Sequence, residues 1–495
     1  MTAVTLSALA LGSALASLRW LRVAQREHYL AGSVGRFAWR WWTATPGSVA
    51  LLLAGVGALG LSPFRSEASL VVAAATAIGP PGLGLKGRTS PLTWTGRLRR
   101  LAAGLSIIVG AGVVAGGLIH PALAALTAMG VPVLIDLVLV VLRPVEERLG
   151  RPWVEKAADA LRESGATVVA ITGSYGKTTT KGYVAHILSA EKRVLASPAS
   201  FNNRMGLARA VNEHLAGEVD VFVAEMGTYG PGEIADLCSW IPPDVAVITA
   251  IGPVHLERFR TEERIVEAKA EILSGADTAI LNVDDSRLAA LAESSGNRRV
   301  IRVGTTGGLE VVVREGRVEV KGEPIGSPPV GAHPGNVACA VGVAVALGLD
   351  PAAVGRRLHG LVEPEHRRTV ATGSSGVVVI DDTFNSNPTG ARAALRALEE
   401  VPVTGRRVVV TPGMVELGPR QPEENRAFAV EVGGSADHLV VVGRTNRRAL
   451  LEGAAAAGTP TTVVSDREEA VSWVKADLGE GDAVLYENDL PDHFP

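Results

Sequence analysis

Thr172-Gly-Ser-Tyr-Gly-Lys-Thr-Thr-Thr180 follows an apolar run, residues 167–171, and precedes a segment with helical character. An apolar strand, a glycine turn and a helix together aim backbone N–H groups and the positive end of a helix at one point. In such a turn Lys177 reaches the β- and γ-phosphates and Thr178 holds Mg²⁺. The stretch therefore predicts a nucleotide site, with an ordinary glycine turn as the alternative. The residues expected to contact the nucleotide here are Gly173, Ser174, Gly176, Lys177, Thr178 and Thr179.

Strands alternate with helices from Trp153 onward, the pattern that parallel sheets produce. Residues 200–206 form a polar, glycine-closed turn before a further helix, and a strand over residues 219–224 ends on Glu225. An acid at the carboxyl end of a buried parallel strand, beside a phosphate loop, is placed to hold Mg²⁺. Glu225 is therefore a candidate metal ligand, and a solvated strand end is the alternative.

Several polar residues of this central part carry little information singly. His255 follows a strand over residues 245–249, and Lys269 belongs to a later helix. A lone histidine is more often a hydrogen-bonded loop residue, and a lone lysine more often lies on a solvated helix face. Residues 309–321 alternate and predict a hairpin that serves as scaffold. Asn336 opens a long apolar helix and could simply cap it.

The last part of the chain predicts a small doubly wound sheet. The polar run at residues 363–368 marks its boundary with the central part. Asp382 and Asn385 follow its first strand closely. The expected strands are residues 376–380, 407–411, 438–442, 461–464 and 483–486.

Length and composition bound the possibilities. A chain of 495 residues suggests roughly three domains, which we place at residues 1–150, 151–360 and 361–495. The net charge of −3 gives no sign of nucleic acid as a partner. Two cysteines, Cys238 and Cys339, exclude a disulfide framework and favour a reducing compartment for the catalytic part.

The first 150 residues resemble a membrane region, which explains a mean hydropathy of +0.24 for the chain. Two segments between the apolar stretches, residues 19–40 and 85–100, are rich in arginine. About five spans with the N-terminus outside place both basic segments and the chain from Arg143 onward in the cytosol. Membrane lipid is then a partner of this region. The apolar stretches are residues 1–18, 48–62, 68–80, 101–119 and 121–142.

Two other interpretations of this region compete with membrane spans. Ala14-Leu-Ala16 could be a signal-peptide cleavage site, but the stretch lacks a basic beginning and a phosphate loop meets no ATP outside the cell. A soluble helical core would not explain the long uncharged stretches with their charge asymmetry. Asp136 lies inside the last stretch and is expected to face other helices or lipid headgroups.

Seven ordered motifs, spread over residues 160–490, resemble those of the Mur ligase family, with the MurF branch the most similar. The motifs are T-G-S-x-G-K-T-T-T, F-N-N-x-x-G, A-E-M-G, H-L-E-x-F, E-A-K-A-E-I-L, G-N-V-A-C-A-V and D-D-T-F-N-S-N-P. The resemblance implies an α/β fold with a central P-loop ATPase domain, built on a mostly parallel sheet, and a C-terminal Rossmann-like domain. It also implies an ATP-dependent amide ligase that requires ATP and one or two Mg²⁺ ions.

The resemblance further implies roles for individual residues. Glu225 and His255 match residues that ligate or support Mg²⁺, together with Thr178. Lys269 matches a lysine that the family carbamylates with CO₂, which gives an additional metal ligand. The nucleotide-side matches are Asn202 and Asn203 near the γ-phosphate, Asn336 at the adenine, and Asp382 with Asn385 at the ribose and base. Arg367 matches a hinge contact to phosphate, and the catalytic set is Lys177, Lys269, His255 and Arg367.

The chemistry agrees with these residue types. Joining a carboxylate to an amine is uphill in water, so the acid must first be activated, and transfer of a phosphoryl group from ATP gives an acyl phosphate. Donor and acceptor are both anions, so Mg²⁺ and Lys177 must neutralise their charge and hold them in line. No arrangement typical of a covalent nucleophile is evident in the sequence.

The chain also departs from the family. Thr369 stands where the family commonly has an acid, and Phe384 and Ser386 replace a tyrosine and an alanine. Apolar stretches stand where the family has a UDP-binding domain. We therefore expect peptidoglycan-type precursor synthesis at the inner face of the membrane, with a lipid- or nucleotide-linked carboxylate substrate and an amino-acid or dipeptide amine. A poly-γ-glutamate-type polymerase and an ATPase-driven transporter or sensor are the alternatives.

Overall fold

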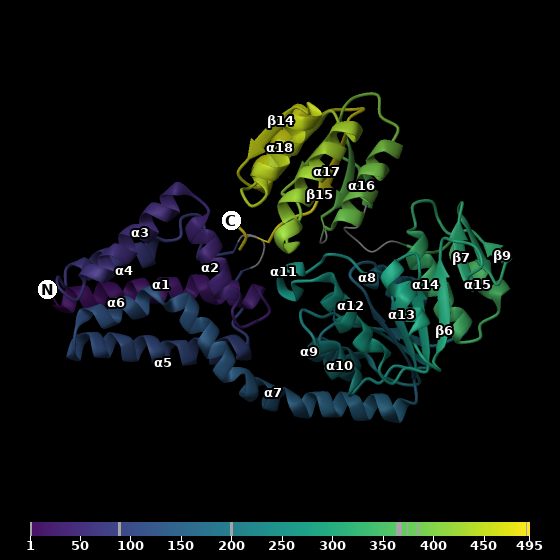
Figure 1. Ribbon diagram of the computed structural model, residues 1–495, viewed down its shortest axis with the longest axis horizontal. Helices are drawn as coiled ribbons and strands as arrows, with labels where there is room; N and C mark the ends of the chain where they lie inside the picture. The colour runs from purple at the N-terminus through teal and green to yellow at the C-terminus, as the bar shows by residue number, and fades with distance from the viewer. Residues whose placement is uncertain are drawn as a thin grey trace.

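The computed structural model has three parts, which follow one another along the chain (Figure 1). They are an N-terminal group of helices, a middle domain around a nine-stranded sheet, and a C-terminal domain around a six-stranded sheet. The α/β class expected from the sequence is confirmed. The structure describes residues 2–87, 91–198, 201–362, 369–373, 375–383, 386–491 and 493–495.

The N-terminal helices pack around their own apolar core. By length and composition, two helices could cross a membrane, residues 3–26 and 96–118, or up to four if each of two bent helix pairs counts as one span. The stretch expected to span at residues 68–80 forms a helix of 11 residues, fewer than the about 20 that a bilayer requires. The helices are α1 (Thr2–Arg26), α2 (Ser33–Thr43), α3 (Pro46–Leu61), α4 (Ala68–Ile78), α5 (Gly96–Leu118), α6 (Pro121–Met129) and α7 (Val131–Ser164).

Helix α7 joins the helical region to the middle domain without a linker. Its first half contributes Ile135 to the core of the helical region, and its second half contributes Ala157 to the core of the middle domain. The expected domain boundary at residue 150 therefore falls inside a continuous helix. Pro144 and Pro152 lie within this helix, and each removes one backbone hydrogen bond. Burial of the apolar face in two separate cores offsets that loss.

The sheet of the middle domain has the order β2-β3-β1-β4-β5-β6-β7-β8-β9. All pairs from β2 to β7 are parallel, and β8 and β9 extend the sheet by antiparallel pairing, so the expected hairpin is confirmed. The strands are β1 (Thr167–Thr172), β2 (Val194–Ala196), β3 (Val221–Glu225), β4 (Val245–Ile248), β5 (Thr278–Asn282), β6 (Arg299–Gly304), β7 (Val311–Arg314), β8 (Arg317–Val320) and β9 (Glu323–Gly326).

Helices cover both faces of this sheet, as parallel pairing requires. One buried apolar cluster lies between the sheet and α7, α9, α10, α12 and α13, and a second lies between the sheet and α8, α14 and α15. The helices are α8 (Lys177–Leu188), α9 (Arg204–His214), α10 (Glu233–Cys238), α11 (Leu256–Phe259), α12 (Glu262–Ala270), α13 (Ser286–Glu293), α14 (Pro334–Ala346) and α15 (Pro351–Leu358). Cys238 and Cys339 are both buried, and neither forms a disulfide.

The C-terminal sheet has the order β10-β11-β15-β12-β13-β14, with β10 antiparallel and the other pairs parallel. The sequence does not predict β10, because its four residues are all exposed and show no apolar alternation. The strands are β10 (Thr369–Thr372), β11 (Val378–Asp382), β12 (Arg407–Thr411), β13 (His438–Val442), β14 (Thr461–Val464) and β15 (Ala483–Glu487), and the helices are α16 (Pro388–Glu400), α17 (Gln421–Ser435), α18 (Arg447–Ala457) and α19 (Arg467–Asp477).

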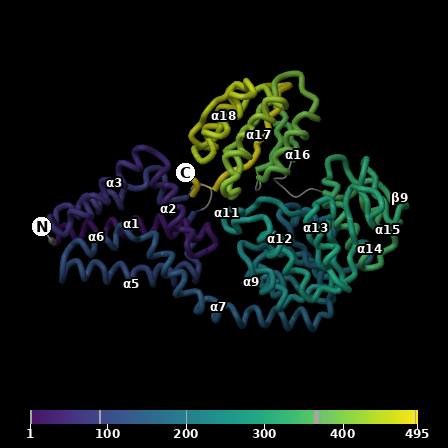
Figure 2. The backbone as a smooth tube through the Cα atoms, viewed as in Figure 1, coloured from purple at the N-terminus to yellow at the C-terminus, as the bar shows by residue number. Residues whose placement is uncertain are grey.

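The end of the chain returns to the N-terminal helices. The backbone trace shows residue 495 beside α2 (Figure 2), and the indole N–H of Trp41 donates a hydrogen bond to the carbonyl of His493 at 2.8 Å. The helical region therefore contacts the C-terminal domain as well as the middle domain.

Candidate active site

The glycine turn lies between β1 and α8, as the sequence predicts. Gly176 has φ of +76°, and a Cβ at this position would lie 2.1 Å from the amide oxygen of Asn336 at the start of α14. Ser174 ties the turn to the chain after β4, because its backbone N–H donates to the Ala250 carbonyl at 2.7 Å. Only glycine fits at residue 176. The turn can therefore pack closely against Asn336 and present backbone groups rather than side chains.

Lys177 and Thr178 begin α8 beside this turn. The ammonium of Lys177 donates to the Gly173 carbonyl at 2.9 Å, so the side chain curls back over the turn. The hydroxyl of Thr178 donates to Glu225 Oε2 at 3.0 Å, while Thr179 is buried behind them. The turn, its lysine and the strand-end acid thus form one cluster.

Glu225 is the centre of that cluster and is only 1% exposed. Asn202 donates to its Oε1 at 3.2 Å, and the ammonium of Lys181 lies 3.1 Å from its Oε2. Burial favours the protonated acid, but the charges of Lys181 and Lys177 outweigh it and lower the pKa of Glu225. Glu225 is therefore a carboxylate, the form that binds Mg²⁺.

Lys181 was not predicted from the sequence. A lysine in a helix usually faces solvent, and the signal available was its position one turn after Lys177, on the same face of α8. Its side chain is 7% exposed. Because it neutralises Glu225, Lys181 belongs to the site as a structural cation.

The neighbouring asparagines divide into two roles. Asn202 points at Glu225, whereas the side chain of Asn203 accepts a hydrogen bond from the Gly206 N–H at 2.9 Å and caps α9. Asn336 lies against the glycine turn, where Gly176 leaves it room. Of the three, the structure places Asn202 and Asn336 at the turn and gives Asn203 a capping contact.

Lys269 is buried in α12, with 3% of the residue exposed. Among the residues that the structure describes, none forms a hydrogen bond or ion pair with its ammonium. Burial is the main reason that the pKa of Lys269 lies well below its ordinary value, and the positive charge of Lys177 lowers it further. Lys269 therefore carries a neutral amine more readily than a surface lysine does.

His255 lies at the seam between the middle and C-terminal domains. Its Nδ1 hydrogen-bonds Glu416 of the loop after β12, and its ring meets Tyr229 edge to face at 5.0 Å. Burial would raise the pKa of Glu416, but His255, Arg258 and Arg40 lower it to about 2. Glu416 fixes the orientation of the imidazole and leaves Nε2 for another contact.

Of the four predicted metal ligands, Thr178, Glu225 and Lys269 lie around the glycine turn, whereas His255 forms no hydrogen bond or ion pair with them in the described part of the chain. No hydrogen bond or ion pair in the described part of the chain links His255 to Glu225, and no group of three or more His, Cys, Asp or Glu there could hold a metal ion. Thr178 and Glu225 are in contact, and Lys269 lies close enough to Lys177 for their charges to interact. The predicted Mg²⁺ set therefore depends on a hydroxyl, a carboxylate and a modified lysine.

The C-terminal domain contributes polar residues at the carboxyl edge of its sheet. Glu487 ends β15 beside Asp382, which ends β11. Its fully buried carboxyl accepts hydrogen bonds from Ser386 and from Thr411, the latter at 2.5 Å. Burial raises the pKa of Glu487 from its ordinary 4.5 to about 7. Two other predicted residues, Arg367 and Asn385, lie outside the described part of the chain.

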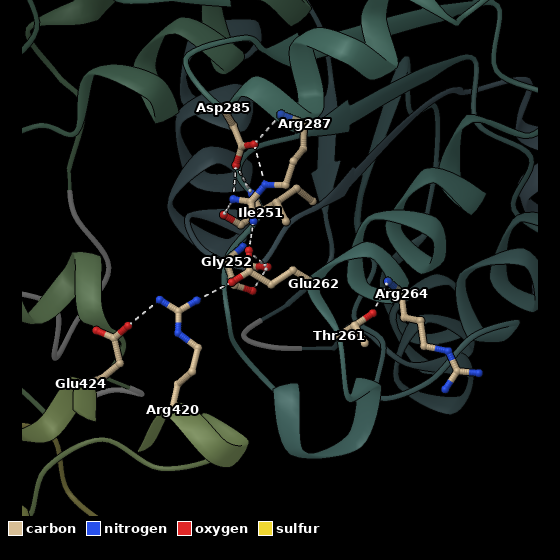
Figure 3. A network of polar contacts seen from close by, with 10 residues as sticks. Ile251, Gly252, Thr261, Glu262, Arg264, Asp285, Arg287, Arg420 and Glu424 are labelled. Atoms are coloured by element: carbon tan, nitrogen blue, oxygen red, sulfur yellow. Dashed lines mark hydrogen bonds and ion pairs between the residues drawn. The ribbon is translucent and has the colours of Figure 1, made fainter. Parts of the chain in front are cut away.

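A chain of ion pairs joins the two catalytic domains near the glycine turn (Figure 3). Arg420 of the C-terminal domain contacts Glu262 at 2.5 Å and Glu424 at 2.9 Å. Glu262 also pairs with Arg287, which holds Asp285 at 2.8 Å. These side chains are partly exposed, so each pair contributes little energy, but together they define how the domains meet.

Comparison with known proteins gives the family to which these two domains correspond. The Mur ligase middle domain matches residues 171–325, and the Mur ligase, glutamate ligase domain matches residues 366–486. The UDP-N-acetylmuramoyl-tripeptide--D-alanyl-D-alanine ligase of Mycobacterium leprae (strain TN) is 32% identical over 384 residues, which cover 66% of this chain and 72% of that protein.

Solved structures agree with the sequence comparison. MurF from Acinetobacter baumannii superimposes with a TM-score of 0.60 at 25% identity, over 68% of this chain and 77% of that one. The MurF ligase from Thermotoga maritima in complex with ADP gives a TM-score of 0.57 at 28% identity, over 68% and 80%. The two family domains that match this chain begin at residues 171 and 366, so neither includes residues 1–170.

We predict that Glu487 makes the C-terminal domain less stable as the pH rises. The folded state binds this proton more tightly than the unfolded state, so stability falls between pH 4.5 and about 7, by up to roughly 3 kcal/mol. Glu487→Gln should remove that loss and raise the Tm at pH 8 more than at pH 5.5, measured by thermal unfolding. Glu468→Gln, an exposed acid of α19, is the control. Equal Tm changes at both pH values would contradict the prediction.

Proposed function

The chain belongs to the Mur ligase family and is an ATP-dependent amide ligase, and from this premise we propose that it builds a peptidoglycan-type precursor at the inner face of a membrane. In the proposed reaction, ATP phosphorylates the carboxylate of one substrate, and the amine of a second substrate displaces phosphate from the acyl phosphate. The observation that supports the proposal is the cluster that Lys177, Thr178 and Asn202 form around the buried Glu225 at the end of two parallel strands.

Each residue of the cluster has a task in that reaction. Lys177, which lies over the glycine turn, would place its positive charge against the phosphoryl group that moves between two anions. Asn202 would donate to a phosphate oxygen once its hydrogen bond to Glu225 is broken. Mg²⁺, bound by Thr178 and Glu225, would supply the remaining positive charge at the transferring phosphoryl group. Lys181 keeps Glu225 ionised throughout.

We extend the proposal to carbamylation of Lys269. Only a neutral amine attacks CO₂, and the burial of Lys269, which lowers its pKa, favours that form. The carbamate would restore a negative charge where Lys177 now adds a positive one, and its oxygens would complete the ligands that Thr178 and Glu225 begin. His255 would support this site through Nε2 while Glu416 holds its Nδ1.

The substrates of the relatives suggest those of this chain. The Mycobacterium leprae enzyme is named for joining a UDP-N-acetylmuramoyl-tripeptide to D-alanyl-D-alanine. We propose that this chain uses an amino acid or dipeptide as its amine and a lipid- or nucleotide-linked carboxylate as its acceptor. Residues outside both matched domains, 1–170, would provide the acceptor contacts that are particular to this chain.

We propose that the N-terminal helices lie in the membrane. Large apolar side chains are exposed on α1, α3, α5 and α7, including Leu11, Leu53, Ile107, Leu118 and Val141, and a soluble protein rarely exposes so many in one region. Lipid tails would cover them. The basic segments at residues 19–40 and 85–100 favour the cytosolic side for the ends that lead to the catalytic domains.

ADP release from the detergent-solubilised chain tests the ligase reaction. We expect release only when an acid and an amine are both present, and mass spectrometry of the product to show one addition rather than a ladder. Lys177→Ala should lower turnover by about a hundredfold or more, because the phosphoryl group loses its cation, whereas Lys192→Ala, an exposed lysine, should not. ATP turnover without an acid and an amine would favour a transporter or sensor, and a ladder would favour a polymerase.

Carbamylation can be tested by chemical rescue. Lys269→Ala should lose most activity, because the metal loses a ligand, and acetate or formate should restore part of it by occupying the vacated space. Lys177→Ala serves as the control, since a carboxylate cannot replace a cation. If short acids rescue neither variant, or both equally, the carbamate assignment is wrong.

Membrane topology is a separate prediction. A reporter fused after residue 150, within α7, should give a cytosolic signal in cells, because ATP and both catalytic domains must share one compartment. A reporter fused at residue 64, between α3 and α4, should give an external signal in the same assay. An external signal at residue 150 would contradict the proposed arrangement.

A further inference from the structure

One buried carboxylate of the helical region contacts both catalytic domains. Glu27, just after α1, has a side chain that is 6% exposed. Its Oε2 lies 2.9 Å from a guanidinium nitrogen of Arg258 in the middle domain, and its Oε1 lies 3.0 Å from Nε2 of His493 at the end of the chain. Burial in low dielectric strengthens such contacts and makes the loss of one partner costly.

The contact continues from Arg258 to His255. The same guanidinium nitrogen of Arg258 lies 3.6 Å from Glu416, and Glu416 accepts the hydrogen bond that orients His255. Arg258 and Glu416 come from different domains, so their pairing closes the seam between them. Glu27 therefore reaches His255 through two charged side chains.

A second route from the helical region reaches the same histidine through aromatic rings. The His28 ring stacks on Tyr229 with 5.4 Å between ring centres, and Tyr229 meets His255 edge to face at 5.0 Å. Arg258 also lies over the Tyr229 ring, 4.7 Å from its centre. Two residues after His255, Glu257 accepts a charge-assisted hydrogen bond from Arg40 of α2.

Helix α2 holds the end of the chain against this junction. Trp41 donates to the His493 carbonyl, and the Phe37 ring packs on His493 at 4.8 Å and on Phe494 at 5.0 Å. Glu27 and His493 both lie outside the ranges that match the two family domains, 171–325 and 366–486. The junction is thus built from segments beyond the parts that this chain shares with the family models.

We propose that Glu27 is a positioning residue for the ligase reaction: through Arg258 and His493 it holds the middle and C-terminal domains together so that Glu416 keeps His255 in place. The helical region is then part of the catalytic unit in addition to its role as an anchor. This inference rests on the proposed ligase function, because its readout is turnover of an acid, an amine and ATP. ATP itself is held at the glycine turn, which Glu27 does not contact.

The test compares Glu27→Gln with the unmodified full chain in the ADP-release assay. Without the carboxylate charge, Arg258 loses its ion pair with Glu27 and keeps the longer one with Glu416, so the seam loosens. We expect kcat to fall by about tenfold to a hundredfold, as small misplacements at reacting centres do, while KM for ATP changes by less than about threefold. Wild-type kcat in Glu27→Gln would overturn the proposal.

A double-mutant cycle separates this route from general loosening. If Glu27 acts through Arg258, combining Glu27→Gln with Arg258→Gln should cost little more than the worse single change. Fully additive losses would overturn the route. Glu146→Gln is the matched control, because Glu146 forms a two-point ion pair with Arg100 at 2.6 Å inside the helical region; its kcat should match that of the unmodified chain.

A second variant and the activity of the unmodified chain make every outcome of the test interpretable. If Glu27→Gln does not fold, as judged by its melting curve, His493→Gln removes the other partner of Glu27, and the same thresholds for kcat and KM apply to it. If the unmodified chain releases no ADP in the presence of any acid and amine, the ligase proposal fails. If the unmodified chain is active and both variants equal it, the positioning role alone fails.

Discussion

The Glu225 carboxylate is buried at the end of β3, and an unpaired charge at such a position would cost several kcal/mol. Lys181 supplies the opposite charge, and Thr178 and Asn202 donate hydrogen bonds to the two carboxylate oxygens of Glu225. Because these donors come from α8 and from the turn before α9, satisfying one carboxylate fixes both segments relative to the sheet. The glycine turn is consequently held in place by contacts within the chain itself.

Much of this arrangement could be predicted because its signals are contiguous in the chain. The strand, glycine turn and helix around Lys177 are consecutive, so their residue types reveal the geometry directly. Glu225 was found because an acid that follows a buried parallel strand must emerge at the sheet edge where the turn lies. The C-terminal strands were found for the same reason, since buried parallel strands are apolar runs bounded by turn residues.

What could not be predicted depends on partners that are distant in sequence or on burial. His255 and Glu416 are separated by 161 positions, and Lys181 looks like a solvated lysine until Glu225 is seen beside it. Glu487 shows no signal of burial, because an acid at a strand end is usually exposed. The continuity of α7 could not be predicted either, because prolines such as Pro144 and Pro152 usually interrupt helices; α7 continues through both, and each of its halves packs in a different core.

The helical region is attached to the catalytic domains at two places, and the two attachments differ in kind. Helix α7 is covalent and enters beneath the middle domain (Figure 1), whereas the Glu27 contacts are ionic and lie at the seam between the domains. A single attachment would let the catalytic domains swing about its axis, but two separated attachments remove that freedom. With the helices in a bilayer, as we propose, the seam that contains His255 is held at a fixed height above the lipid. An acceptor anchored in the same leaflet then needs to search in two dimensions only.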